Sequence, residues 1–250
     1  MKAPRLFKTA GHWAIVVAAV TTLSAGAGLA APARKPMTGV WRPEAPSGSM
    51  KTLEGRTPPL NAAGKALYER RISEKKAGKD QDGVGVCLPP GSPRIMWQST
   101  PMMVLDTPRK VTLVYEFQHI QRHIHLTDPM PAAEDLNPAF GGTSVGRWEG
   151  DTLVVQTLGF GEKTQLDADG LPHSPQMKLT ERIRLIDGGS RLEDRVTVDD
   201  PRFYSQPWTA RVTFARAPGV SLAEDICAEK LLKTKVRDYW AEHQKSLAAR

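Results

Sequence analysis

Residues 177–198, MKLTERIRLIDGGSRLEDRVTV, alternate apolar and polar side chains on both sides of a glycine-containing turn. Strict alternation over several residues is typical of a half-buried β-strand. The residues 187–190, DGGS, supply the types that tolerate a tight reversal of the chain. The stretch therefore predicts an antiparallel hairpin with one face directed into a core.

Further strands are predicted on either side of this hairpin. Apolar alternation and β-branched residues mark residues 111–117, 119–126, 145–148, 152–157 and 208–215. Strands do not alternate with helices, so a doubly wound parallel sheet is excluded. The pattern predicts a mainly β fold, either an antiparallel β-barrel of the lipocalin or calycin kind or a sandwich. A barrel would supply an enclosed cavity.

The chain divides into four predicted segments. They are a signal peptide at 1–30, an irregular and helical segment at 31–86, an antiparallel β domain at 87–220, and a C-terminal helix packed on that domain at 221–250. The second segment contains a short amphipathic helix at 61–76. Ser221 and Glu224 form a capping-box pattern that predicts the start of the last helix.

The first 30 residues have the pattern of a secretory signal peptide. Lys2, Arg5 and Lys8 precede a stretch without charge that ends in small residues before Ala31. The alternative is an uncleaved anchor, but threonine, serine and glycine interrupt the apolar run. We expect cleavage near Ala30, a periplasmic or secreted protein, and no stable membrane span afterwards.

Composition and charge narrow the classes of partner. The chain has 250 residues, of which 24% are charged and 40% hydrophobic, so it is neither disordered nor collagen-like. Cleavage would lower the net charge from +7 to +4, because the first 30 residues carry three positive charges and no acid. No dense basic run interleaved with aromatic residues is present, so nucleic acid is not an expected partner. No phosphate-binding loop, dinucleotide fingerprint or haem-attachment motif occurs, so no cofactor is expected.

Cys87 and Cys227 both lie in the mature part of the chain. An exported chain with two cysteines is expected to join them in a disulfide, the alternative being two buried thiols. Neither cysteine has a second cysteine or histidine at ligand spacing, so a zinc site is not predicted.

The middle of the chain resembles a known family. Residues 142–157, Glu181-Arg182 and residues 200–209 match the pattern GxSxGxWEGDTLVVxT … ER … DPxxYxxPWT. This pattern is similar to that of a large family of exported bacterial proteins without an assigned activity. The resemblance covers roughly residues 87–229 and implies export and a β-rich domain, but no reaction. Relatives usually carry Asp-Gly-Arg after the histidine-rich strand, where this chain has Asp128-Pro129-Met130.

Histidines gather in the segment that follows residue 117. His119, His123 and His125 lie within seven residues, beside Arg122. If the strand from Val111 is continuous, the three imidazoles share its apolar face and point into a cavity, where they could act as acid, base or ligand-binding groups. If a bulge near Gln118 swaps the faces, the histidines contact solvent instead. Further ligands are not evident, so no metal is predicted.

Glu181 is the carboxylate whose position is most informative. It shares a strand face with apolar residues on either side, where burial is costly unless the charge is paired. A raised pKa would prepare it for acid–base chemistry. The alternative is a structural ion pair with a core arginine such as Arg122 or Arg94. Asp194 has a similar position on the following strand.

Two hypotheses of function follow, with a third as the plainest alternative. The first is an exported enzyme that needs no cofactor, a lyase or isomerase acting on a small organic molecule, with His123, His173 and Glu181 as acid–base groups and Arg122 binding an oxyanion. The second is a protein that binds a small apolar or aromatic ligand. Its expected ligand-binding residues are Arg122, His119, His125, Trp148, Tyr204 and Trp208. The third is an envelope interaction protein with a filled core.

Overall fold

The hairpin at residues 177–198 is present in the computed structural model, which describes residues 34–231. Strands β7 (Lys178–Ile186) and β8 (Arg191–Asp199) pair in antiparallel fashion through a short turn, η5 (Asp187–Gly189). Gly188 and Gly189 in this turn have φ angles of 68° and 99°, which glycine adopts without steric cost. The alternation therefore predicted both strands, and the residues DGGS predicted the turn between them.

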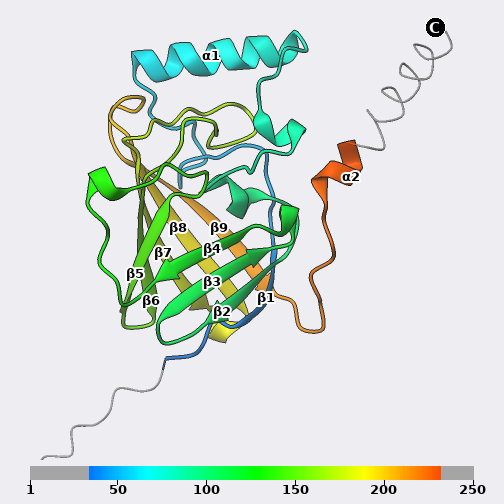
Figure 1. The fold of residues 1–250 in the computed structure, drawn as a ribbon, viewed down its shortest axis with the longest axis vertical. Coiled ribbons are helices and arrows are strands. Elements are labelled where there is room, and N and C mark those ends of the chain that lie inside the picture. Colours follow the sequence, from blue (N-terminus) through cyan, green and yellow to red (C-terminus); the bar gives the residue numbers. More distant parts are fainter. Residues whose placement is uncertain (1–33, 232–250) are drawn as a thin grey trace, which may run out of the picture. The chain divides into compact units, whose positions relative to one another are not determined.

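Nine strands close into a barrel in chain order (Figure 1). The remaining strands are β1 (Gly39–Pro43), β2 (Met102–Asp106), β3 (Lys110–Tyr115), β4 (Gln121–His125), β5 (Thr143–Glu149), β6 (Thr152–Leu158) and β9 (Trp208–Arg216). The helical elements are α1 (Ala62–Lys76), η1 (Gly83–Val86), η2 (Arg94–Trp97), η3 (Phe117–His119), η4 (Ala133–Asp135) and α2 (Cys227–Leu231). The mainly β class and the barrel alternative are confirmed.

Closure depends on strands that the sequence pattern did not predict. β1 pairs with β2 on one side and with β9 on the other, and Trp41 contributes to both registers. All neighbouring strands are antiparallel except β4 and β5, which pair in parallel. β1 lies in a segment rich in proline and glycine, where local patterns favour loops, and only its place between two other strands makes it a strand.

Side chains occupy the interior of the barrel. Trp41 and Phe214 are among the largest fully buried ones, and they form one core with buried apolar residues of every strand except β5. Alternation along each strand places these residues inside and most charged residues outside; Arg122, Glu181 and Asp194 are charged-type residues that lie inside. Packed side chains thus occupy the interior around Trp41 and Phe214, and the cavity described below opens between two strands of the barrel.

The predicted N-terminal helix is confirmed as α1, which lies over the loops at one end of the barrel (Figure 1). The Asn61 side chain caps it by accepting a hydrogen bond from the Gly64 amide at 3.0 Å. A Cβ on Gly64 would come within 2.2 Å of the Phe203 carbonyl oxygen, so glycine permits this close approach. Arg71 and Lys75 donate to carbonyls of the loop between β6 and β7.

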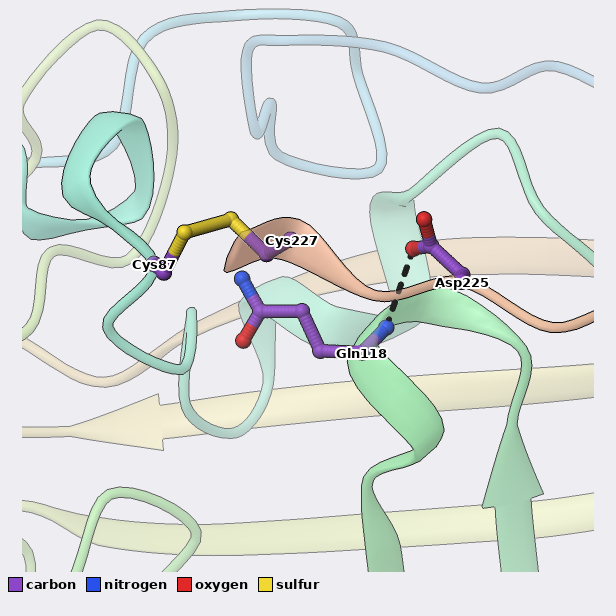
Figure 2. Close-up of a disulfide and its surroundings, with 4 residues drawn as sticks. All are labelled: Cys87, Gln118, Asp225 and Cys227. Atoms are coloured by element: carbon purple, nitrogen blue, oxygen red, sulfur yellow. Dashed lines mark hydrogen bonds between the residues drawn. A yellow bond between two sulfur atoms is a disulfide. The ribbon is translucent and has the colours of Figure 1, made fainter. Parts of the chain in front are cut away.

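The start of the C-terminal helix differs from the prediction. Residues 221–226 are not helical, and α2 begins at Cys227. The Ala223 and Asp225 amides donate to Glu116 and His119, which holds this segment in a non-helical conformation against η3. Cys227 forms the predicted disulfide with Cys87, beside Gln118 and Asp225 (Figure 2).

Two predictions fall wholly or partly outside the described residues. The signal peptide at 1–30 lies before residue 34, and the rest of the expected C-terminal helix lies after residue 231. Within residues 34–231, no helix combines the length and the apolar character needed to cross a membrane.

Candidate functional site

A cleft opens in the barrel wall where β4 and β5 diverge. Only Ile124 and His125 of β4 have partners in β5, namely Ser144 and Val145. Gly142, directly before β5, has a φ of 65°, a conformation that glycine adopts readily, and the pairing does not extend to Gln121, Arg122 or His123 of β4. The divergence leaves a cavity of about 410 Å³, which we call the β4–β5 cleft.

The walls of the cleft are mainly apolar. Ile95, Ile120 and Phe140 contribute large side chains, and glycine and proline residues of the neighbouring loops contribute backbone. Polar side chains also line it; these are Ser92, Tyr115, Gln121, Arg122, His123, His125, Thr143 and Ser144. A concave, largely apolar site with a few polar groups is typical of small-molecule binding sites.

Arg122 belongs to a buried ion pair with Glu181. Its Nη1 donates to Glu181 Oε1 at 2.7 Å, its Nη2 donates to Oε2, and Glu181 has no exposed surface. The remaining donors reach Ser144 Oγ at 3.1 Å and Thr157 Oγ1 at 2.9 Å. Burial lowers the pKa of Arg122, but the Glu181 charge outweighs it and raises that pKa overall. The structural alternative for Glu181 is therefore the one observed, with Arg122 as its partner.

Asp194 lies beside this pair in the barrel interior. It sits one pleat away from Glu181 on the neighbouring strand, because Glu181 pairs with Val196 and Ile183 pairs with Asp194. Within residues 34–231, neither of its carboxylate oxygens has a hydrogen-bond partner. Burial raises the pKa of Asp194 well above its usual range, and the nearby Glu181 carboxylate raises it further. The direction of this shift favours the protonated form of Asp194.

The histidines lie outside the barrel, contrary to the inward-facing alternative. η3 interrupts the strand, with positive φ angles at Gln118 and His119, and β4 restarts on the other face. This is the predicted bulge, and it buries Arg122 and Ile124 while exposing His123. The strand is not continuous because the Tyr115 amide bonds to the Ile120 carbonyl across the turn.

His123 and His125 flank the cleft, whereas His119 does not. His123 Nδ1 lies 3.2 Å from Thr112 Oγ1, and partial burial lowers the pKa of His123, with Lys110 and His125 adding to the shift. His125 Nδ1 lies 3.2 Å from Asp128. His119 Nε2 accepts a hydrogen bond from the Asp225 amide at 2.9 Å and so holds the C-terminal segment.

His173 occupies a buried loop position that does not line the cleft. Its Nε2 lies 2.5 Å from Thr164 Oγ1, and its Nδ1 lies 3.3 Å from the Ser174 carbonyl. Burial lowers the pKa of His173 and favours the neutral imidazole. His123, His173 and Glu181 therefore lie in three different surroundings, and the structure does not bring them together as an acid–base set.

The three aromatic residues expected to wall a ligand lie away from the β4–β5 cleft. Trp148 is half-buried, with the Arg34 guanidinium 3.5 Å from its ring centre. Tyr204 is buried and donates to the Pro172 carbonyl at 2.8 Å. Trp208 packs on Tyr204 with 5.5 Å between ring centres and lines a separate groove of about 490 Å³.

Sequence reasoning missed the residues that make the cleft apolar, including Ile120 and Phe140. A local signal was present, since Gly141-Gly142 directly precedes a strand and marks a departure from regular pairing. No signal of this kind indicates which strand lies opposite. Among residues 34–231, no group of three or more histidine, cysteine or acidic residues is arranged to hold a metal ion.

No protein-family model and no curated protein matches the chain. One solved structure to which it is similar is titled "REP1-NXSQ fatty acid transporter". The identity is 9%, the TM-score is 0.35, and the match covers 72% of this chain and 96% of the other. A similarity this low says nothing about what this chain binds, and the assignment of a barrel rests on its own strand pairing.

Proposed function

We propose that the protein binds a small, mainly apolar molecule in the β4–β5 cleft, without transforming it. The observation that carries the proposal is the cavity of about 410 Å³ between the diverging strands, with its apolar walls. A pocket of this size suits a small organic molecule. In this proposal the protein acts after export, as the pattern of residues 1–30 predicts.

The polar groups of the cleft support binding rather than chemistry. Arg122 and Ser144 satisfy each other and their neighbours, and the Tyr115 hydroxyl donates to the Met96 sulfur at 2.8 Å. Groups that are already satisfied act as a fixed wall, because a ligand that broke these bonds would leave a buried charge unpaired. Specific polar contacts to the ligand are left to the other polar side chains at the cleft, which are Ser92, Gln121, His123, His125 and Thr143.

Acid–base catalysis, predicted from the sequence, has less support. A general base must lie within hydrogen-bond reach of the proton that it removes. Glu181 is fully engaged by Arg122, and His173 does not line the cleft. Of the three predicted acid–base residues, His123 is the one that lines the cleft. Neither of the other two lies there to act as its partner.

Blocking the cleft tests the proposal. Thr143 is half-buried and lines the cleft, so Thr143→Trp should fill part of it. With anilinonaphthalene sulfonate as a fluorescent apolar probe, we expect the affinity to fall by at least about tenfold, or ~1.4 kcal/mol. Thr152→Trp is the matched control, because Thr152 is equally half-buried on the partner strand and does not line the cleft.

The control should bind the probe as the unmodified protein does. Equal binding by both variants would place the probe elsewhere and refute the proposal. Melting temperatures of the two variants, measured without the probe, establish that each remains folded.

A further inference from the structure

Five arginines cluster on the outer face of the barrel from β5 to β9, and we call this surface the arginine face. They are Arg147, Arg182, Arg184, Arg195 and Arg211. A further arginine of β8, Arg191, lies apart from the cluster and pairs with Glu44 and Asp187. Arg182 pairs with Arg195, and Arg195 pairs with Arg211, so three guanidinium side chains lie side by side on three neighbouring strands. Like charges directly opposite each other destabilise a sheet unless something compensates them.

Two glutamates contact the arginines, and they form hydrogen bonds with four of the five. Glu193 contacts Arg184 at 2.8 Å, Arg195 at 3.2 Å and Arg211 at 3.9 Å, and its side chain is only 5% exposed. Glu149 contacts Arg147 at 2.6 Å and Arg182 at 3.1 Å. The arginine side chains remain 45–62% exposed.

The guanidinium groups of the arginine face keep part of their positive charge exposed to solvent. Within this cluster of seven residues, five arginines against two glutamates give an excess of three positive charges. Each guanidinium has five N–H donors, so contact with one carboxylate leaves others free. The glutamates orient four of the guanidinium groups through hydrogen bonds, which reduces the entropy lost when an anion binds.

We propose that the arginine face binds a flexible linear polyanion that carries phosphate groups. Arginine matches phosphate through paired hydrogen bonds. The row crosses neighbouring strands at about 4.8 Å each and therefore follows the curve of the barrel wall. A flexible chain can follow this curve, whereas a planar membrane touches only part of it and a single phosphate reaches only adjacent arginines.

The polar character of the face also favours such a chain over a membrane. The large exposed hydrophobic residues within the described part of the chain are Leu53, Val86, Leu88, Leu105 and Ile226. None of them belongs to the strands β5 to β9. A surface that inserts into a bilayer usually offers apolar side chains beside its basic ones.

The test uses inorganic polyphosphate as the probe and two triple variants with the same change in net charge. R182Q/R195Q/R211Q removes the centre of the arginine face. K65Q/R70Q/K76Q removes three exposed charges from α1. We expect the first variant to bind polyphosphate on the order of tenfold or more weakly at low salt, and its log–log salt slope to fall by about 2, as for three lost phosphate contacts.

The α1 variant should keep both the affinity and the slope. An equal loss in the two variants would show attraction to net charge alone and would overturn the proposal. Orthophosphate competing as strongly as polyphosphate, at equal phosphate concentration, would also overturn it. So would arginine-dependent sedimentation with phosphatidylglycerol vesicles in the absence of polyphosphate binding, because the partner would then be a membrane surface.

Discussion

Glu181 lies inside the barrel with both carboxylate oxygens hydrogen-bonded by Arg122. The sequence placed this carboxylate among apolar neighbours and left two explanations open, a catalytic group or a structural pair. Three-dimensional contact decides between them, because Arg122 comes from β4, which is not a sheet neighbour of β7. No local pattern around residue 181 could identify that partner.

Breaking the pair should destabilise the fold. Glu181→Gln leaves the Arg122 charge buried without its carboxylate, and we expect a loss of about 3–5 kcal/mol in the free energy of unfolding. Urea denaturation measures it. The double variant R122M/E181L should lose less, since it removes both charges. A Glu181→Gln variant as stable as the unmodified protein would contradict the structural role.

Asp194 should make stability depend on pH. Its pKa is raised in the folded state, so between the unfolded and folded pKa values the folded protein binds more protons. Stability therefore falls as the pH rises through that window, which begins near about 4. Asp194→Asn should gain stability relative to the unmodified protein as the pH is raised, in denaturation series at several pH values. A constant difference across the series would show that Asp194 does not titrate in this way.

At the scale of elements, a left-handed glycine, Gly142, directly precedes β5, and we expect its conformation to shape the divergence of β4 and β5. Gly142 has a φ of 65°, and a Cβ there would lie 2.7 Å from the Leu158 carbonyl oxygen and 2.8 Å from Thr157 Cγ2. Gly150, in the turn between β5 and β6, has a φ of 59° and nothing within 4 Å of a Cβ. An alanine would be strained by the positive φ at both positions but crowded by neighbouring atoms only at Gly142. Comparing the two substitutions therefore separates the cost of backbone strain from the cost of steric crowding.

We expect Gly150→Ala to cost about 1–2 kcal/mol, the penalty of the left-handed conformation alone. Gly142→Ala should cost more and should weaken ligand binding in the cleft, because crowding moves the segment that forms its wall. Thermal denaturation and probe titration measure the two effects. Equal costs at both positions, with the cleft unchanged, would show that Gly142 does not shape it.

Elements were predictable where the local pattern agreed with the tertiary environment. The hairpin of β7 and β8 and the helix α1 carry alternation, turn or capping signals of their own. β1 becomes a strand through its neighbours, and residues 221–226 lose their predicted helix to contacts with Glu116 and His119. The same limit applies to the histidines, since the positive φ at Gln118 decides which face of β4 is buried.

At the scale of the whole molecule, the barrel has three regions of different character. Its interior is packed around the Arg122–Glu181 pair, its wall opens at the β4–β5 cleft, and its outer face from β5 to β9 carries the arginines. The sequence predicted the class of fold and the disulfide. It could not predict the cleft, which forms where two strands joined by a long connection meet without full pairing.

The most direct test of the central claim is NMR mapping of the probe on isotope-labelled protein. The proposal predicts that anilinonaphthalene sulfonate shifts the amide signals of residues 120–125 and 139–144, on the two sides of the cleft. It also predicts that Thr143→Trp reduces these shifts at the same probe concentration. Shifts confined to other residues, such as those of the groove beside Trp208, would contradict it.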